Sequence, residues 1–387
     1  MRKISIWLAG ALVLTAIIVT FLTTTWLDRF AGVQRQDKLV EAADLIEASY
    51  IGTADRKAMT DAAISAMVES LGDQWSYYLT AEQLEQYREF EGNRYQGLGL
   101  VVKNGDTGGV VIYSVYRDSP AGKAEIRPGS RILAVNGNDA ENATLEEAME
   151  LVTAAIAEGN VRLVLLTPDG QQETYELTPG TVDTDPVSWE LLPDSVGYVR
   201  ILNFEDRSGE QAVQAAEELC AQGAKGLVFD VRDNPGGQLW QLLQILDRLL
   251  PEGALFISKD IQGKVETETS DAVCLEMPMA VLVNSGSYSA AEFFAAALQE
   301  YGYAKVVGEQ TYGKGYFQTT HLLSDGSAVH ISTGKYYTPK GVSLVGVGIT
   351  PDRVVELTDE ENADLYYSKL DKEKDPQLQE AIAAIKD

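Results

Sequence analysis

Histidine and cysteine are nearly absent from this chain, which has two of each among its 387 residues. Protein zinc sites are built largely from clusters of these residue types. No such cluster exists here, so the sequence predicts no metal site, and we expect no other cofactor. Cys220 and Cys274 could form one disulfide, but the sequence cannot show that they meet; we favour two buried, unpaired thiols.

Basic residues are also in deficit. The 31 lysines and arginines are outnumbered by 58 acidic residues, which gives a formal net charge of -27 at pH 7. A nucleic-acid-binding surface must be basic, so this composition argues against nucleic acid as a partner and against adhesion to an anionic membrane surface. The apolar share of 45% is ordinary for a globular protein, and the length allows two or three domains.

One long apolar run is present near the N-terminus. Residues 4–22 carry no charge and are about long enough to span a bilayer, and Arg2 and Lys3 precede them. No Ala-x-Ala cleavage site follows, so we interpret residues 1–30 as an uncleaved signal anchor, with a cleaved signal peptide as the alternative. Basic residues before the run predict a cytoplasmic N-terminus. The body is then expected on the extracytoplasmic side of the cell membrane, or secreted or periplasmic if the segment is cleaved.

Residues 31–92 have helical character. Apolar residues recur there at steps of three and four positions, as in Leu39, Ala42, Ala43, Ile46 and Tyr50. The region is too short for a large core, so we expect it to pack against another domain or against a second copy of itself.

Residues 93–180 are expected to form a small β-rich module with a capped helix over 145–156. Leu98, Gly99 and Leu100 belong to a glycine-rich loop that runs into a strand. The backbone N–H groups of such a loop can hold a carboxylate, and the strand after it can pair with an extended peptide. Alternatively, the glycines serve only the turn.

Residues 181–358 alternate strands with helices. We expect strands over 196–201, 226–231 and 280–283, and helices over 208–220, 238–250 and 290–301. This alternation predicts an α/β body with a largely parallel sheet, whose ligands lie beyond the carboxyl ends of the strands. Two turns, one with Gly236 and Gly237 and one with Ser289, follow such ends. The remaining segment, 359–387, is expected to be a charged, weakly helical tail.

Ser289 is expected where a strand turns into a helix, a position that exposes its hydroxyl. A serine nucleophile needs a base. His321 and His330 lie on or next to expected strands, outside any recognisable triad, whereas Lys314 lies between two glycines in surroundings that could keep its amine neutral. Gln318 could hydrogen-bond that amine. The alternative is that Ser289 only caps the helix and that Lys314 is a solvated loop residue.

Acyl transfer also requires N–H donors for the oxyanion. The N–H of Ala290 is free at the expected helix start, and a second donor could come from Gly236 or Gly237. An ordinary tight turn is the alternative interpretation of these glycines.

Two sets of motifs go beyond these single residues. One is Ser119-Pro120-Ala121-Gly122, Arg127-Pro128-Gly129 and Asn136-Gly137. The other is Leu71-Gly72-Asp73, Asp233-Asn234-Pro235-Gly236-Gly237, Ser287-Tyr288-Ser289-Ala290-Ala291-Glu292, Thr311-Tyr312-Gly313-Lys314-Gly315, Tyr336-Tyr337-Thr338-Pro339 and Gly348-Ile349-Thr350-Pro351-Asp352. The first set resembles the signature of a PDZ domain. The second resembles the C-terminal processing (tail-specific) serine peptidases, in the family's order, from about residue 36 to residue 355.

The resemblance implies an α/β fold, α+β overall, with a ClpP/crotonase-like protease core, an inserted PDZ domain and a helical N-terminal region through which members commonly dimerise. It implies an exported, PDZ-gated serine endopeptidase that cleaves protein substrates at or near their C-termini by acyl-enzyme hydrolysis. Proteins or peptides bound through their C-termini would be its partners.

The same resemblance implies the residue roles. Ser289 matches the family's nucleophile, Lys314 its general base and Gln318 the lysine-orienting residue. The oxyanion hole is matched by Ala290 with Gly236 and Gly237, and the carboxylate-binding loop of the PDZ domain by Leu98, Gly99 and Leu100.

Several positions depart from the family's pattern. Tyr288 and Ala291 interrupt the usual small-small-Ser-Glu pattern around Ser289, and Glu125 replaces the glycine of the PDZ turn. Residues 153–159 lack the Arg-Gly turn that in some relatives links the PDZ domain to the protease. A catalytically silent PDZ-type scaffold that recruits protein C-termini is one alternative. A crotonase-like enzyme acting on acyl thioesters is another, against which the PDZ module and the export segment argue.

Overall fold

The computed structural model describes residues 18–21, 23, 38–105, 108–366 and 369–386. Most of the predicted signal anchor, residues 1–17, 22 and 24–30, lies outside the described residues. Across the described part of the chain, no helix is long and apolar enough to cross a membrane. The chain divides into two compact units, residues 1–80 and 81–387.

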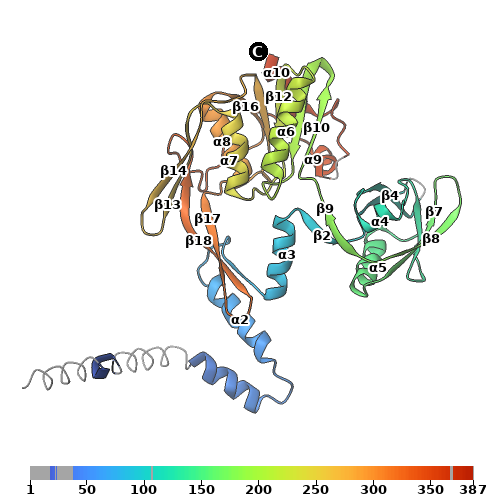
Figure 1. Cartoon of the computed structure of the whole chain (residues 1–387), viewed down its shortest axis with the longest axis vertical. Coiled ribbons are helices and arrows are strands. Elements are labelled where there is room, and N and C mark those ends of the chain that lie inside the picture. Colours follow the sequence, from blue (N-terminus) through green and yellow to red (C-terminus); the bar gives the residue numbers. More distant parts are fainter. Residues whose placement is uncertain (1–17, 22, 24–37, 106–107, 367–368, 387) are drawn as a thin grey trace, which may run out of the picture. The chain divides into compact units, whose positions relative to one another are not determined.

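Helices dominate the first unit (Figure 1). One helix covers residues 38–49, and α2 (Arg56–Glu69) begins after its N-cap Asp55, whose carboxylate accepts the Ala58 N–H. The Arg56 guanidinium pairs with Asp44 at 2.5 Å and with Glu47 at 2.8 Å, so the start of α2 is tied to the preceding helix. A short strand, β1 (Tyr77–Leu79), follows α2.

The apolar residues of this first unit are largely exposed. Leu39, Leu45, Tyr50 and Met67 each expose half or more of their surface, and Val68 is the buried residue of α2. Because burial of apolar surface is what stabilises a fold, this unit has apolar surface available for packing against other protein.

The second unit begins with α3 (Ala81–Glu91), and a β-rich module follows it. Its chain enters through β2 (Arg94–Gly97) and leaves through β9 (Gly180–Asp183), which pair antiparallel. Between them lie β3 (Leu100–Asn104), β4 (Val110–Val115), α4 (Pro120–Lys123), β5 (Arg131–Val135), β6 (Asn138–Asp139), α5 (Leu145–Ala157), β7 (Val161–Leu166) and β8 (Gln172–Leu177). Thr144 and Glu147 close a capping box at the start of α5, the capped helix expected over 145–156.

The sheet of this module leaves one edge open. Its strand order is β3-β4-β5-β7-β8, with β6 paired to β5. β3 is therefore an edge strand, and one row of its backbone N–H and C=O groups faces no other strand of the described chain. The core under the sheet contains Ile112, Ile132, Leu163 and Leu165, all buried.

A six-stranded sheet forms the centre of the rest of the second unit, which follows β9. Its order is β10 (Val187–Leu192), β11 (Val196–Ile201), β12 (Gly226–Asp230), β15 (Met279–Val283), β16 (Ala304–Gly308) and β19 (Arg353–Val354). β10 pairs antiparallel with β11, and every other neighbouring pair is parallel. The prediction of a largely parallel sheet in an α/β body is confirmed.

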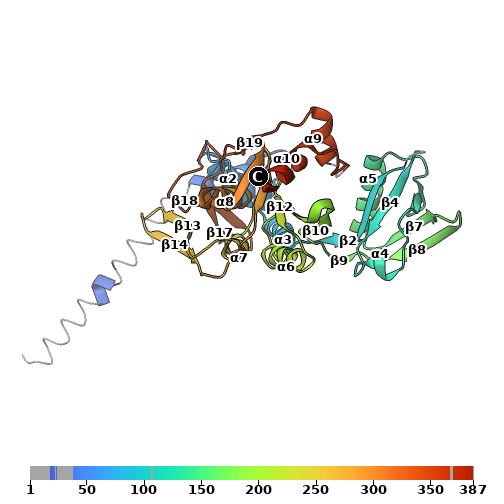
Figure 2. The same cartoon turned by 90° about the horizontal axis from the view of Figure 1, so that it is seen from above.

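Helices cover both faces of this sheet. Successive residues of a strand point to opposite sides, and nearly all residues of β11, β12 and β15 are buried, so both sides need a covering layer. α6 (Ser208–Ala221), α7 (Leu239–Leu249) and α8 (Ala290–Tyr301) lie on one face (Figure 1), over strand residues such as Val199 and Phe229. α10 (Pro376–Lys386) covers the other face (Figure 2), where Leu378, Ala381 and Ala384 pack over Tyr198, Val228 and Leu282. The segment expected as a weakly helical tail thus contains α9 (Asp359–Tyr366) and a helix that completes the core.

Four strands of a second, antiparallel sheet come from segments between the strands of the first. β13 (Gly253–Asp260) pairs with β14 (Val265–Ser270) and with β18 (Ala328–Tyr337), and β18 also pairs with β17 (Tyr316–Leu322). β17 begins two residues after Lys314, so the lysine loop connects β16 of the parallel sheet to this second sheet. Cys220 and Cys274 are both free and half-buried, so they form no disulfide.

Candidate active site

Ser289 lies at the point where β15 has ended and α8 begins. Its backbone adopts φ 59° and ψ -123°, a region that a residue with a side chain rarely enters and that costs about 1–3 kcal/mol. The Ser289 side chain makes no capping hydrogen bond to α8. The alternative in which this serine only caps the helix is therefore wrong, and the strained turn presents a hydroxyl that α8 does not use.

Two turns at the carboxyl ends of neighbouring parallel strands are tied together. The Asp233 N–H donates to Asn284 Oδ1 at 2.9 Å, and Asn284 Nδ2 donates to Asp233 Oδ1 at 2.8 Å. The Ser287 hydroxyl donates to the Val231 carbonyl at 2.7 Å. These contacts hold the turn after β12, which carries the two glycines, against the turn that carries Ser289.

Gly236 touches the backbone around Ser289. A Cβ at this position, where φ is 92°, would lie 2.7 Å from the Ser289 Cβ and 2.8 Å from the Ala290 nitrogen, so only glycine fits. The Gly236 N–H already donates to Asn234 Oδ1 at 2.8 Å. By contrast, the N–H groups of Gly237 and Ala290 donate to no acceptor in the described residues. Of the two glycines that the sequence offered as oxyanion donors, Gly237 is therefore the one whose N–H is available.

Glu292 joins the serine helix to the lysine loop. It lies one turn into α8, is fully buried, and accepts the Gly313 N–H at 2.8 Å and the Lys314 N–H at 3.0 Å. The Thr311 hydroxyl also donates to it. Burial raises the pKa of Glu292 to about 7, although these three hydrogen bonds act in the opposite direction.

Sequence reasoning gave Glu292 no role. A signal was present, since Glu292 is the charged residue at the start of a helix whose neighbours Ala290, Ala291, Phe293 and Phe294 are all apolar. A carboxylate on a helix that is apolar on all sides must find buried donors.

Tyr336 on β18 contacts the other side of the lysine loop. Its hydroxyl donates to the Lys314 carbonyl at 2.7 Å, and its ring packs against Phe256 and Phe293. Burial raises the pKa of the Tyr336 phenol well above its usual range, and the Glu292 carboxylate adds to this, whereas the Ser289 hydroxyl, a hydrogen-bond partner, lowers it. Ser289, Glu292, Lys314 and Tyr336 are thus brought together from α8, the turn before it, β18 and the loop between β16 and β17.

Gln318 is fixed on β17 four residues after the lysine. Its Nε2 donates to the Tyr316 carbonyl and to Ser332 Oγ, both at 3.1 Å. Because both amide hydrogens are engaged, the amide cannot turn over, and its oxygen remains as the acceptor that a lysine amine could use.

The two histidines lie on the β17–β18 ladder. His321 is exposed, and His330 shares a 2.8 Å hydrogen bond with Thr320 across the ladder. Burial lowers the pKa of His330 to about 4, and the nearby positive charge of Lys314 adds to the effect. His330 is consequently neutral at pH 7.

The loop with Leu98, Gly99 and Leu100 is closely packed against the start of α4. Gly99 has φ 80°, and a Cβ there would lie 2.0 Å from the Ser119 Cβ. The Ala121 N–H donates to the Leu98 carbonyl at 2.9 Å, and the Tyr116 N–H donates to the Gly99 carbonyl at 3.0 Å. Both carbonyls are thus bonded within the module. The Gly99 backbone also makes a hydrogen bond to the Tyr95 phenol.

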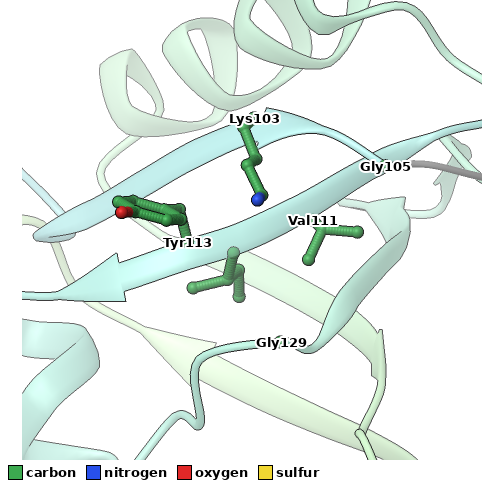
Figure 3. A pocket seen from close by; sticks show the side chains of 6 residues that line it. Lys103, Gly105, Val111, Tyr113 and Gly129 are labelled. Atoms are coloured by element: carbon green, nitrogen blue, oxygen red, sulfur yellow. The ribbon is translucent and has the colours of Figure 1, made fainter. Parts of the chain in front are cut away.

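A hollow of about 240 Å³ lies on the β3–β4 hairpin (Figure 3). Lys103, Val111 and Tyr113 line it, and the Lys103 ammonium lies 4.9 Å from the centroid of the Tyr113 ring. Its lining includes no carboxylate, serine or histidine, so we assign it no part in the chemistry.

Three families of known proteins match parts of this chain. Residues 195–355 match the peptidase family S41, residues 89–166 match the PDZ domain, and residues 23–83 match the activating protease CtpB N-terminal domain. A putative S41 protease from Bacteroides fragilis has a similar fold, with a TM-score of 0.57 and 16% identity, over 89% of this chain and 96% of that one.

Two curated relatives are similar over most of their length. The carboxy-terminal processing protease CtpA of Bacillus subtilis is 32% identical over 348 residues, which cover 88% of this chain and 73% of the relative. The carboxyl-terminal-processing protease of Synechocystis sp. is 33% identical over 304 residues, which cover 77% of this chain and 71% of the relative. With its S41 core and its PDZ domain, this chain belongs to the S41 family of carboxyl-terminal processing serine proteases.

Proposed function

We propose that this chain is an exported serine endopeptidase that cleaves protein substrates at or near their C-termini, with Ser289 as nucleophile and Lys314 as general base. The observation that carries the proposal is the Glu292 carboxylate. It lies one turn after Ser289 and holds the backbone N–H groups of Gly313 and Lys314, so it binds the two halves of the dyad to each other. Gln318 then orients the lysine amine.

The reaction would follow the usual course of acyl transfer. A neutral Lys314 amine takes the proton of Ser289 as its oxygen attacks the substrate carbonyl carbon. The charge that develops on the carbonyl oxygen is met by the N–H groups of Ala290 and Gly237. The C–N bond then breaks, and the Lys314 ammonium returns its proton to the leaving amine. Water, activated by the same lysine, hydrolyses the acyl-enzyme and restores Ser289.

Labelling and turnover together test this assignment. We expect a fluorophosphonate probe to modify Ser289, as identified by peptide mass spectrometry, and we expect the full chain to hydrolyse casein or an unstructured peptide. Absence of both labelling and turnover would favour the alternative of a silent PDZ-type scaffold.

The PDZ module would select and gate substrates. A substrate C-terminus would add as a strand to the open edge of β3, with its carboxylate at the loop of Leu98, Gly99 and Leu100. Leu100 and Val102 of β3 and Val152 of α5 are partly exposed apolar residues over the module core, which suits an apolar last side chain. Occupancy of this groove would be needed for efficient cleavage.

Gly99→Ala is expected to weaken binding of a peptide with a free C-terminus by about tenfold or more. The added Cβ overlaps Ser119, so the loop must shift. Fluorescence anisotropy with free-acid and amidated versions of one peptide measures this, and amidation alone should weaken binding to the wild type. Gly137→Ala is the matched control, since φ is 83° there but a Cβ would meet nothing within 4 Å. Equal binding of the two peptides by the wild type would contradict the carboxylate site.

Export and dimerisation are further parts of the proposal. Residues 1–30 would anchor the chain in the cell membrane with the catalytic body outside, or would be removed as a signal peptide. The exposed apolar residues of the first unit, among them Leu39, Leu45 and Met67, support association of two copies through residues 31–92. Residues 93–180 would form the PDZ domain and residues 181–358 the protease core. Membrane fractionation and sedimentation of the full chain test these points.

A further inference from the structure

A buried ion network lies directly behind the turn that carries Gly237. Arg232, two residues after β12, is 2% exposed. Its Nε donates to Asp230 Oδ1 at 2.9 Å and its Nη2 to Asp230 Oδ2 at 2.6 Å, a two-point contact. The same guanidinium donates to Asp375 Oδ2 at 2.7 Å and to Gln377 Oε1 at 2.9 Å. Half of the acceptors of this arginine therefore come from a segment more than 140 positions later in the chain.

The charges in this network balance only when Asp375 is included. Arg200 donates to Asp230 Oδ2 at 3.0 Å, so Asp230 serves two guanidinium groups. Asp230 and Asp375 are both almost completely buried. Two cations and two anions thus share one interior site, and loss of either carboxylate would leave a buried positive charge without its counter-ion.

The start of α10 holds the two acceptors in place. Asp375 Oδ1 accepts the Gln377 N–H at 3.0 Å and the Leu378 N–H at 3.1 Å, so Asp375 also caps the helix. Gln377 Nε2 donates to the Val355 carbonyl at 2.8 Å. Because Leu378 is buried against the sheet, neither acceptor can move without moving α10.

Arg232 in turn determines how the chain enters the turn of residues 233–237. Its own backbone N–H donates to Asp230 Oδ1 at 3.0 Å. The next residue, Asp233, has φ 57°, a strained value that the surroundings must enforce, and donates to Asn284 beside the serine turn. A shift of Arg232 would therefore change the direction in which the Gly237 N–H points.

We propose that Asp375 and Gln377 are positioning residues of the active site, which hold Arg232 and through it the oxyanion turn. The inference rests on the proposed peptidase function. Both residues lie beyond 355, where the match to the peptidase family ends.

The full chain with Asp375→Asn tests the proposal, because asparagine keeps the size of the side chain and removes its charge. We expect kcat for peptide hydrolysis to fall about tenfold, part of what loss of a whole oxyanion donor costs. KM and the affinity of the PDZ groove for a free C-terminus should stay unchanged. Asp371→Asn is the control, since Asp371 lies in the same segment and its ion pair, with Lys374, is exposed.

Chemical rescue separates positioning from general destabilisation. In Asp375→Ala, added formate should restore part of kcat by replacing the missing carboxylate, and chloride at the same ionic strength should not. If the Asp375 variants do not fold, Gln377→Met, which removes one acceptor and keeps the volume, should still lower kcat severalfold at constant KM.

The inference would be overturned if folded Asp375→Asn had the kcat of the wild type. If the Asp375 variants do not fold, a wild-type kcat in Gln377→Met would overturn it. Failure of formate to exceed chloride would do the same. The wild-type chain is measured in the same assay. If the proposed peptidase function is wrong, neither the wild type nor any variant will cleave the peptide, whereas a failure of this inference alone leaves wild-type turnover intact.

Discussion

Lys314→Met is expected to lower kcat for peptide hydrolysis by about 10⁴-fold, the upper end of what a general base supplies. Methionine keeps the length and packing of the lysine stem but cannot take the Ser289 proton. Ser289→Ala should lower kcat further, by about 10⁶-fold, because the nucleophile itself is lost. Steady-state hydrolysis of a fluorogenic peptide, with circular dichroism to verify folding, measures both effects.

Lys335→Met is the matched control for the lysine substitution. Lys335 lies on β18, with its ammonium 5.3 Å from the centroid of the Tyr316 ring, and takes no part in the proposed reaction. Its replacement should change kcat by less than about threefold, as expected for an exposed residue outside the chemistry. Full activity in Lys314→Met would reject the dyad and direct attention to His330, whose pKa is lowered by burial and by the Lys314 charge.

Glu292→Gln is expected to lower kcat/KM by about 100-fold at pH 8, the cost of a small misplacement of a catalytic group. The carboxylate accepts three donors, from Thr311, Gly313 and Lys314, whereas an amide offers one acceptor oxygen and turns its NH2 group toward donors. The loop that carries Lys314 should therefore loosen. Glu300→Gln is the control, because Glu300 lies on the same helix and holds a different loop through Thr338 and Lys340.

The pH dependence gives a second measure of the same substitution. The pKa of Glu292 is raised from the ordinary 4.5 to about 7 by burial. The folded protein thus keeps a proton that the unfolded chain releases, so this group's contribution to stability is full below pH 4.5 and is lost as pH rises through 7. Tm should accordingly fall less between pH 5 and pH 8 in Glu292→Gln than in the wild type. An ionisation near pH 7 in the kcat/KM profile should also disappear, and its persistence in the variant would assign it to another group.

Sequence patterns located the serine turn because its neighbours are strongly apolar. β15 has five buried residues, and α8 spans the predicted residues 290–301. β12 and α6 also agree with their predicted ranges to within one residue. A continuous apolar run between turn residues is the pattern that a fully buried strand requires.

Other elements carried no such signal. Five of the six residues of β14 are exposed, so the strand has no apolar face, and it forms through its backbone pairing with β13. The contact face of α10 combines the alanines Ala381 and Ala384 with Leu378 and the partly buried Ile382 and Ile385. This one short apolar face follows residues 359–375, which are mostly charged or polar. The expectation of a weakly helical tail followed from this composition.

Side-chain contacts between residues far apart in the sequence also could not be predicted from the sequence. The Glu292 contact to the Lys314 N–H joins residues 22 positions apart, and the Arg232 contact to Asp375 joins residues 143 positions apart. Each depends on which strands are neighbours in the sheet, which the local spacing of residue types does not determine. Ser289 and Lys314 could therefore be named from the sequence, whereas the residues that hold them could not.

The position of α10 in the chain also orders events during synthesis. α10 follows every candidate catalytic residue, so a ribosome has already made Ser289 and Lys314 when it reaches Asp375. Until α10 emerges, one face of the parallel sheet is uncovered and Arg232 lacks two of its acceptors. A growing chain folds from its N-terminal side as it appears. The nascent enzyme is accordingly expected to stay inactive until α10 has emerged and docked, which would delay proteolysis of other chains during its own synthesis.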